Sequence, residues 1–116
     1  MGSNALSPDR RIRRRAEFQR VFEAGRRAHG RYLTIIAIPA SRDVARLGIV
    51  ASRKLGGAVV RNRAKRLIRE VFRSHVQPAG GCDLVIIPKQ AVIEAKVIDI
   101  ARDFQATLKR LGLSRQ

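Results

Sequence analysis

Basic side chains recur along one stretch of the chain at the spacing of a helical turn. Arg61, Lys65, Arg69 and Arg73 stand four residues apart, and the stretch contains a single acidic residue, Glu70. Like charges at this spacing destabilise an isolated helix, so a polyanion lying along the row would offset the repulsion. Guanidinium groups form paired hydrogen bonds with phosphate. The row therefore indicates phosphate binding rather than bond-breaking chemistry.

The whole chain is small and strongly basic. It has 116 residues, 25 Lys and Arg, 9 Asp and Glu, and a formal net charge of +16, yet 45% of it is hydrophobic and can form a core. Of the basic side chains, 19 lie in residues 1–75. Such a charge repels itself in a compact protein and favours a polyanionic partner. Asn62, a neutral amide inside the row, can read a base edge or a 2′-hydroxyl, which favours RNA over an anionic lipid surface.

Few residues could carry catalysis by the protein itself. Cys82 is the only cysteine, and the two imidazoles, His29 and His75, show no spacing that pairs them with it. The chain has no glycine-rich nucleotide loop and no carboxylate cluster of magnesium-binding spacing. We therefore expect no catalytic residue, no metal site, no cofactor and no small-molecule substrate on the protein.

Membrane segments are not expected either. No apolar run approaches the roughly 20 residues that span a bilayer. Residues 1–6 lack the apolar core of a secretory signal. We expect a cytoplasmic protein with no membrane partner.

Apolar periodicity predicts the elements that must position the basic row. Helical spacing indicates helices, and β-branched runs bounded by polar or glycine-containing segments indicate strands. The predicted elements are a helix over 16–24, strands over Arg27–Gly30, Arg31–Pro39 and Ala45–Ser52, the cationic helix Ala58–Val76, a buried strand Asp83–Pro88, and a last helix with its apolar stripe from Val97 to Leu111.

This order, α-β-β-β-α-β-α, mixes strands and helices without strict alternation and predicts an α+β fold, a small central sheet with helices packed on it. Residues 1–15 end in a run of like charges, which predicts a flexible basic arm. We expect one RNA-binding domain over residues 16–112 and a short tail over 113–116.

Two segments carry recognisable motifs. The first reads Lys54-x-Gly56-x-Ala58-Val59-x-Arg61-Asn62-Arg63-x-Lys65-Arg66, preceded by Arg46-Leu47-Gly48-Ile49-Val50 and Ser52-Arg53. The second reads Glu17-Phe18-x-x-Val21-Phe22-x-x-Gly25. Both resemble the protein subunit family of bacterial ribonuclease P, and the resemblance spans about residues 10–111.

The resemblance implies a fold, a function and two binding surfaces. The implied fold is a single-domain α+β sandwich with a central mixed four-stranded sheet and a left-handed βαβ crossover through the cationic helix. The implied partners are the ribonuclease P RNA, which cleaves precursor tRNA with Mg²⁺, and the single-stranded 5′ leader of that precursor. The implied RNA-subunit contacts are Arg53, Lys54, Arg61, Asn62, Arg63, Lys65, Arg66, Arg69 and Arg73. The implied leader contacts are Phe18, Phe22, Tyr32 and Ile36.

The leader contacts have a second interpretation. Phe18 and Phe22 stand four residues apart on an amphipathic helix and could equally be core residues. Relatives often carry an aromatic residue where this chain has Ile36, and Tyr32, expected on the same strand face, could substitute for it.

Three other functions remain open from the residues alone. They are a structural ribosomal RNA-binding protein, a DNA-binding domain and a protein nuclease. No helix-turn-helix or dimerisation heptad accompanies the basic helix, which disfavours the DNA-binding domain. Co-purification with ribosomal subunits would favour the first, and cleavage of precursor tRNA by the protein alone would favour the last.

Overall fold

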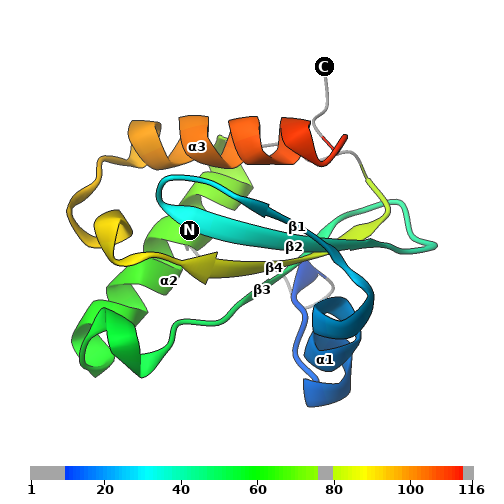
Figure 1. The fold of residues 1–116 in the computed structure, drawn as a ribbon, viewed down its shortest axis with the longest axis horizontal. Coiled ribbons are helices and arrows are strands. Elements are labelled where there is room, and N and C mark those ends of the chain that lie inside the picture. The colour runs from blue at the N-terminus through cyan, green and yellow to red at the C-terminus, as the bar shows by residue number, and fades with distance from the viewer. Residues whose placement is uncertain (1–9, 76–79, 114–116) are drawn as a thin grey trace, which may run out of the picture.

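The computed structural model describes residues 10–75 and 80–113. Its elements are α1 (Arg15–Ala24), β1 (Arg26–His29), β2 (Leu33–Pro39), β3 (Arg46–Ile49), η2 (Arg53–Leu55), α2 (Ala58–Ser74), β4 (Cys82–Pro88), η3 (Gln90–Glu94) and α3 (Val97–Arg110). Figure 1 shows α1 below the sheet and α3 above it. The predicted order of helices and strands is confirmed, and only the short 3₁₀ segments η2 and η3 are additional.

The sheet is mixed, with strand order β1-β2-β4-β3. Strands β1 and β2 are antiparallel, as are β2 and β4, whereas β3 and β4 are parallel. Because α2 connects the parallel neighbours β3 and β4, the fold contains a βαβ crossover through the cationic helix. The hand of that crossover stays a prediction.

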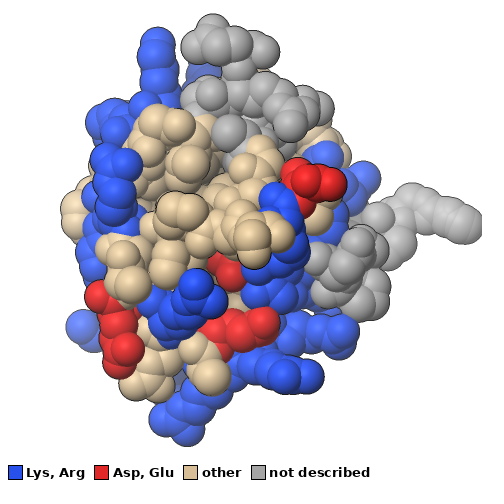
Figure 2. Space-filling model, turned by 90° about the vertical axis from the view of Figure 1, so that its right-hand side faces the viewer, with Lys and Arg blue, Asp and Glu red and all other residues tan. Residues whose placement is uncertain are grey.

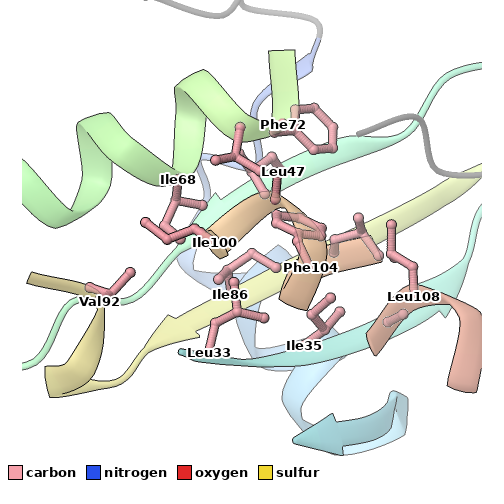
Figure 3. Close-up of a cluster of buried hydrophobic side chains, with 14 of the residues drawn as sticks. Leu33, Ile35, Leu47, Ile68, Phe72, Ile86, Val92, Ile100, Phe104 and Leu108 are labelled. Carbon is pink, nitrogen blue, oxygen red and sulfur yellow. The ribbon is translucent and has the colours of Figure 1, made fainter. Parts of the chain in front are cut away.

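The two central strands divide their side chains between two cores, as the alternation of side chains along a strand requires. On one face, Leu33 and Ile86 join the larger core, which packs against α2 and α3 (Figure 3). Within it, the Phe72 and Phe104 rings lie 6.4 Å apart. On the other face, Ile36 belongs to a smaller core beneath α1.

Part of the predicted flexible arm, residues 10–12, lies against the sheet in the structure. Arg11 bridges Leu47 of β3, and the Ile12 amide donates a 2.9 Å hydrogen bond to the Leu47 carbonyl. Ile12, the one apolar residue among the arginines, is buried in the smaller core. Burial of that side chain and pairing with the edge of β3 order the segment despite its charge. Residues 1–9 of the predicted arm lie outside the described residues.

Two other predicted boundaries fall near undescribed positions. The end of the predicted cationic helix, Val76, is outside the described residues, and α2 ends at Ser74. Leu113, the first residue of the predicted tail, packs against the larger core, and positions 114–116 are not described. Within residues 10–75 and 80–113, no helix is both long and apolar enough to span a membrane.

Candidate nucleic-acid interface

Helix α2 presents its cations in two rows that differ in burial. Its apolar side is as predicted, with Ala64, Ile68 and Val71 completely buried. On the polar side, four residues are exposed: Asn62, Arg63, Arg66 and Arg73. The other row, Arg61, Lys65 and Arg69, is half-buried. Thus all the predicted contacts on α2 face away from the core, but at different depths.

The residues before α2 extend the cationic surface. Arg53 and Lys54 lie on η2 and are exposed. Leu55 of η2 is buried in the larger core and anchors this turn next to α2. Gly56 has a φ of 143°, a conformation that L side chains rarely adopt, and it separates η2 from α2. The predicted contacts Arg53 and Lys54 therefore project from a turn that is attached to the core.

Among the described residues, the half-buried cations of α2 have no acidic partner. The ion pairs among the described residues link Arg42 and Arg46 to acids and involve none of Arg61, Lys65 and Arg69. Burial, and secondly the charge of Arg11, lowers the pKa of Arg69. Within the described part of the chain, the buried Nε atoms of Arg11 and Arg61 have no hydrogen-bond partner.

Phe18 stands at the junction of α1, β3 and α2. Together with Arg11, Gly48, Lys65 and Arg69 it lines a depression of about 90 Å³. A Cβ atom on Gly48 would lie 2.6 Å from Phe18 Cε1, so only glycine lets the ring sit this close to β3. The structure thus brings together a predicted leader contact and two predicted RNA-subunit contacts, which the sequence analysis assigned to separate surfaces.

Phe22 lies at the opposite edge of the same sheet face. It is half-buried and packs against the smaller core. The guanidinium of Arg27 lies over its ring, 5.9 Å from the ring centroid. The sequence analysis missed Arg27, although its register opposite Ile36 places it beside this face once β1 is assigned.

The structure places Tyr32 and Ile36 against different cores, so the prediction that they share a strand face is wrong. Ile36 is 0% exposed beneath α1, so it cannot contact a ligand in this conformation. Tyr32 precedes β2, and its ring packs against the larger core instead of sharing a face with Ile36. The amide groups of Arg31 and Tyr32 each donate a 2.8 Å hydrogen bond to Asp103, so the chain turns toward α3 before the strand alternation begins.

A network of ion pairs attaches α1 to the sheet. Arg46 Nη2 lies 3.0 Å from Glu17 Oε2 and 3.0 Å from Asp83 Oδ2, while Arg42 Nη1 lies 2.8 Å from Asp83 Oδ1. Hydrogen bonding to Asp83 raises the pKa of Arg46. Burial acts to raise the pKa of Glu17, but hydrogen bonds from the Arg14 amide and from Arg46 outweigh it and lower that pKa. The network therefore holds Phe18, next to Glu17, in place.

Among the described residues, no side chains are arranged for nucleophilic catalysis or for metal binding. Cys82 is buried, and desolvation raises the pKa of its thiol to about 11, which keeps it protonated at neutral pH. Among residues 10–75 and 80–113, no three His, Cys, Asp or Glu side chains are grouped as metal ligands.

Figure 2, a view of the molecule from the right-hand side of Figure 1, shows Lys and Arg side chains around much of this face.

Fold and surface together define an α+β domain built around a cationic helix. The family model for ribonuclease P matches residues 6–112. The chain is 33% identical to the ribonuclease P protein component of Syntrophomonas wolfei over 109 residues, which cover 93% of this chain and 92% of that protein. It is 43% identical to the component from Desulfovibrio desulfuricans over 95 residues, covering 79% and 72% of the two chains. The chain therefore belongs to the ribonuclease P protein component family.

Solved structures agree with this assignment. The Staphylococcus aureus ribonuclease P protein superimposes with a TM-score of 0.76 at 32% identity, covering 91% of this chain and 98% of that one. The protein from Thermotoga maritima gives a TM-score of 0.75 at 31% identity, covering 86% and 96%. The predicted fold class and family are both confirmed.

Proposed function

We propose that this chain is the protein subunit of a ribonuclease P ribonucleoprotein. In this proposal it binds the catalytic RNA through α2 and η2, and the 5′ leader of precursor tRNA through the face of α1. Membership of the ribonuclease P protein component family supports the role as a subunit. The observation that carries both the RNA-subunit and the leader contacts is the row of half-buried cations Arg61, Lys65 and Arg69. These have no acidic partner among the described residues, and the row continues into the depression beside Phe18.

Phosphate groups suit the cations of α2 for an energetic reason. A buried polar group without a partner costs about 1–3 kcal/mol, and more when it is charged. Nε of Arg61 and Nε of Arg11 are in that position among the described residues. Phosphate oxygens of a docked RNA would supply the missing acceptors, and the exposed Arg63 and Arg66 would contact the same backbone from outside.

Leader binding would use the aromatic side chains of α1. The half-buried Phe18 ring can stack on an unpaired base, which contributes about 1–3 kcal/mol without requiring a given sequence. Lys65 and Arg69, in the same depression, are placed to contact the adjoining phosphate. At the other edge of the sheet, Phe22 and the Arg27 guanidinium offer a second stacking position.

The protein would assist hydrolysis without performing it. We infer that Mg²⁺ held by the RNA subunit carries the chemistry, and that the protein contributes in two ways. Its cations lower the repulsion between catalytic RNA and substrate, which reduces the Mg²⁺ concentration required. Its leader contacts favour precursor over mature tRNA, because only the precursor has a leader to bind.

Reconstitution with a bacterial ribonuclease P RNA tests the proposal. The protein is expected to lower the Mg²⁺ concentration needed for cleavage and to improve binding of precursor relative to mature tRNA. Failure of both effects would overturn the proposal. Cleavage of precursor tRNA by the protein without RNA would instead assign the chemistry to the protein.

Salt dependence locates the RNA surface. Replacing Arg63 and Arg66 together by Ala is expected to reduce the slope of log affinity for the RNA subunit against log salt. The reduction should match one to two phosphate contacts, at roughly 0.7–0.9 per contact. The matched control is replacement of Arg102 and Lys109, exposed cations of α3, by Ala. Equal slopes for the two double variants would place the RNA contact elsewhere.

A further inference from the structure

A second pocket lies away from α1, where the tip of the β1–β2 hairpin meets η3. Its volume is about 570 Å³, within the roughly 300–1,000 Å³ typical of pockets for small organic groups. Arg31 and Tyr32 line it from the hairpin, and Gln90, Ile93 and Glu94 line it from η3. Tyr32 and Ile93 also pack against the larger core, so the pocket belongs to the α2 and α3 side of the sheet.

The hairpin wall of this pocket is held in place by hydrogen bonds from outside the hairpin. Asp103 of α3 accepts the amide hydrogens of Arg31 and Tyr32, both at 2.8 Å. Lys89, which follows β4, donates its amide to the Tyr32 carbonyl at 2.8 Å and its Nζ to the Gly30 carbonyl at 2.6 Å. A ligand therefore meets a preformed wall and bears little ordering cost.

Glycine at position 30 is part of this arrangement. A Cβ atom there would lie 2.5 Å from Asp103 Oδ2 and 2.6 Å from Thr107 Oγ1, so a larger residue would push the hairpin tip off α3. In addition, Arg110 donates a hydrogen bond to the His29 carbonyl. An exposed hairpin tip is thus fastened to α3 through successive residues.

The chemistry of the lining suits a flat, neutral, hydrogen-bonding group. The Arg31 guanidinium carbon lies 5.5 Å from the centroid of the half-buried Tyr32 ring. Aromatic rings and guanidinium planes are the surfaces on which unpaired bases stack. The exposed Gln90 and Glu94 offer donors and acceptors for a base edge. The lining carries one positive charge, from Arg31, and one negative charge, from Glu94, whereas α2 carries many cations and the single acid Glu70.

We propose that this pocket binds an unpaired nucleobase of RNA. The base stacks on the exposed face of the Arg31 guanidinium, with Tyr32 beneath it, and hydrogen-bonds to Gln90. Because η3 packs against α2 (Figure 1), a strand that follows the cations of α2 passes beside the pocket and can place one nucleotide in it. The proposal rests on the proposed function only for the source of that RNA.

The test uses the full chain and a short RNA, without the ribonuclease P RNA. A single-stranded hexa-adenylate is titrated into ¹⁵N-labelled protein, and the amide signals of Ile93 and Ala95, which line the pocket, are followed. A hexamer of equal charge with abasic riboses is the matched ligand. We expect the two signals to shift with hexa-adenylate and to shift far less with the abasic hexamer, since its phosphates remain but its bases are missing.

Two variants complete the test. Arg31→Ala is expected to weaken hexa-adenylate binding at the pocket about fivefold or more, as loss of one stacked base predicts. Arg102→Ala removes an arginine of α3 that is also exposed, and it is expected to change hexa-adenylate binding less than about twofold. Gln90→Ala should also weaken binding, and its exposed side chain leaves the core intact.

Three results would overturn the inference. They are no shift of Ile93 and Ala95 with hexa-adenylate, equal shifts with the abasic hexamer, or equal loss of affinity in the Arg31 and Arg102 variants. The outcome is separate from that of reconstitution with ribonuclease P RNA, because the pocket is observed through its own amide signals and with a different RNA.

Discussion

Arg46→Met is the substitution whose effect on stability follows most directly from the structure. Arg46 donates three hydrogen bonds to carboxylates, two to Asp83 at 3.0 and 3.1 Å and one to Glu17 at 3.0 Å. The Arg46 side chain is only 17% exposed and that of Asp83 only 10%. Methionine fills a similar length without the charge, so the change removes the network's central cation while largely retaining its packing.

The magnitude depends on what remains around Asp83. Removing one partner of a buried ion pair costs about 3–5 kcal/mol, because the other charge is left unpaired. Here Arg42 still contacts Asp83 through two hydrogen bonds, at 2.8 and 3.2 Å. We therefore expect the low end, a loss of about 3 kcal/mol in the free energy of unfolding.

Arg42→Met is the matched control. The Arg42 side chain is 35% exposed, and its loss leaves Asp83 paired with Arg46. A partly exposed pair of this kind contributes about 1 kcal/mol or less. Urea unfolding followed by circular dichroism gives both values, with an unchanged m-value showing that two-state unfolding is retained. Equal costs for Arg42→Met and Arg46→Met, or a cost below about 1 kcal/mol for Arg46→Met, would refute the role assigned to Arg46.

Three further predictions concern α1 and the strands beneath it. Gly48→Ala should force the Phe18 ring off β3 and lower the free energy of unfolding by about 1–3 kcal/mol, as measured by urea unfolding. It should also weaken leader-dependent binding, as measured by comparing the affinities for precursor and mature tRNA. Folding lowers the pKa of Glu17, so the stabilising effect of its carboxylate is present at neutral pH and is lost as the pH falls through the folded pKa. In thermal melts from pH 7 to 3, the stability difference between Glu17→Gln and the unchanged protein should shrink below about pH 4.5, the ordinary pKa. A stability difference that stays constant with pH would contradict this. Ile36→Tyr should destabilise the fold by about 1–3 kcal/mol in urea unfolding and add no leader affinity, because the side chain is completely buried beneath α1. A gain in leader affinity with unchanged stability would show that the position is accessible.

Much of the fold could be predicted because local patterns determine individual elements. The apolar positions of α2 repeat at helical spacing, and the strand around Val85 is a continuous apolar run, so both were located to within a few residues. The position of residues 10–12 against the sheet was not predicted, because the composition of this segment is dominated by repulsion between arginines. The buried Ile12 and the open edge of β3 outweigh that repulsion, and the edge exists only in the folded sheet.

The candidate site was predicted less completely than the fold. The positions on α2 could be identified because charge and helical spacing are properties of one segment. The prediction that Tyr32 and Ile36 share a strand face failed because it depended on how far the strand alternation extends and on what covers the sheet. Tyr32 lies before β2 and turns toward Asp103, and α1 covers Ile36. Neither fact can be read from residue spacing.

The sequence by itself determined the net charge, the cationic side of one helix, the order of the elements and the family motifs, since each depends on neighbouring residues. Only the tertiary structure decided which of those features meet. It placed Phe18 beside Lys65 and Arg69 in one depression, and Tyr32 beside η3 in another. The physical reason is that such contacts join segments distant along the chain, and packing of the two cores against the sheet sets their positions.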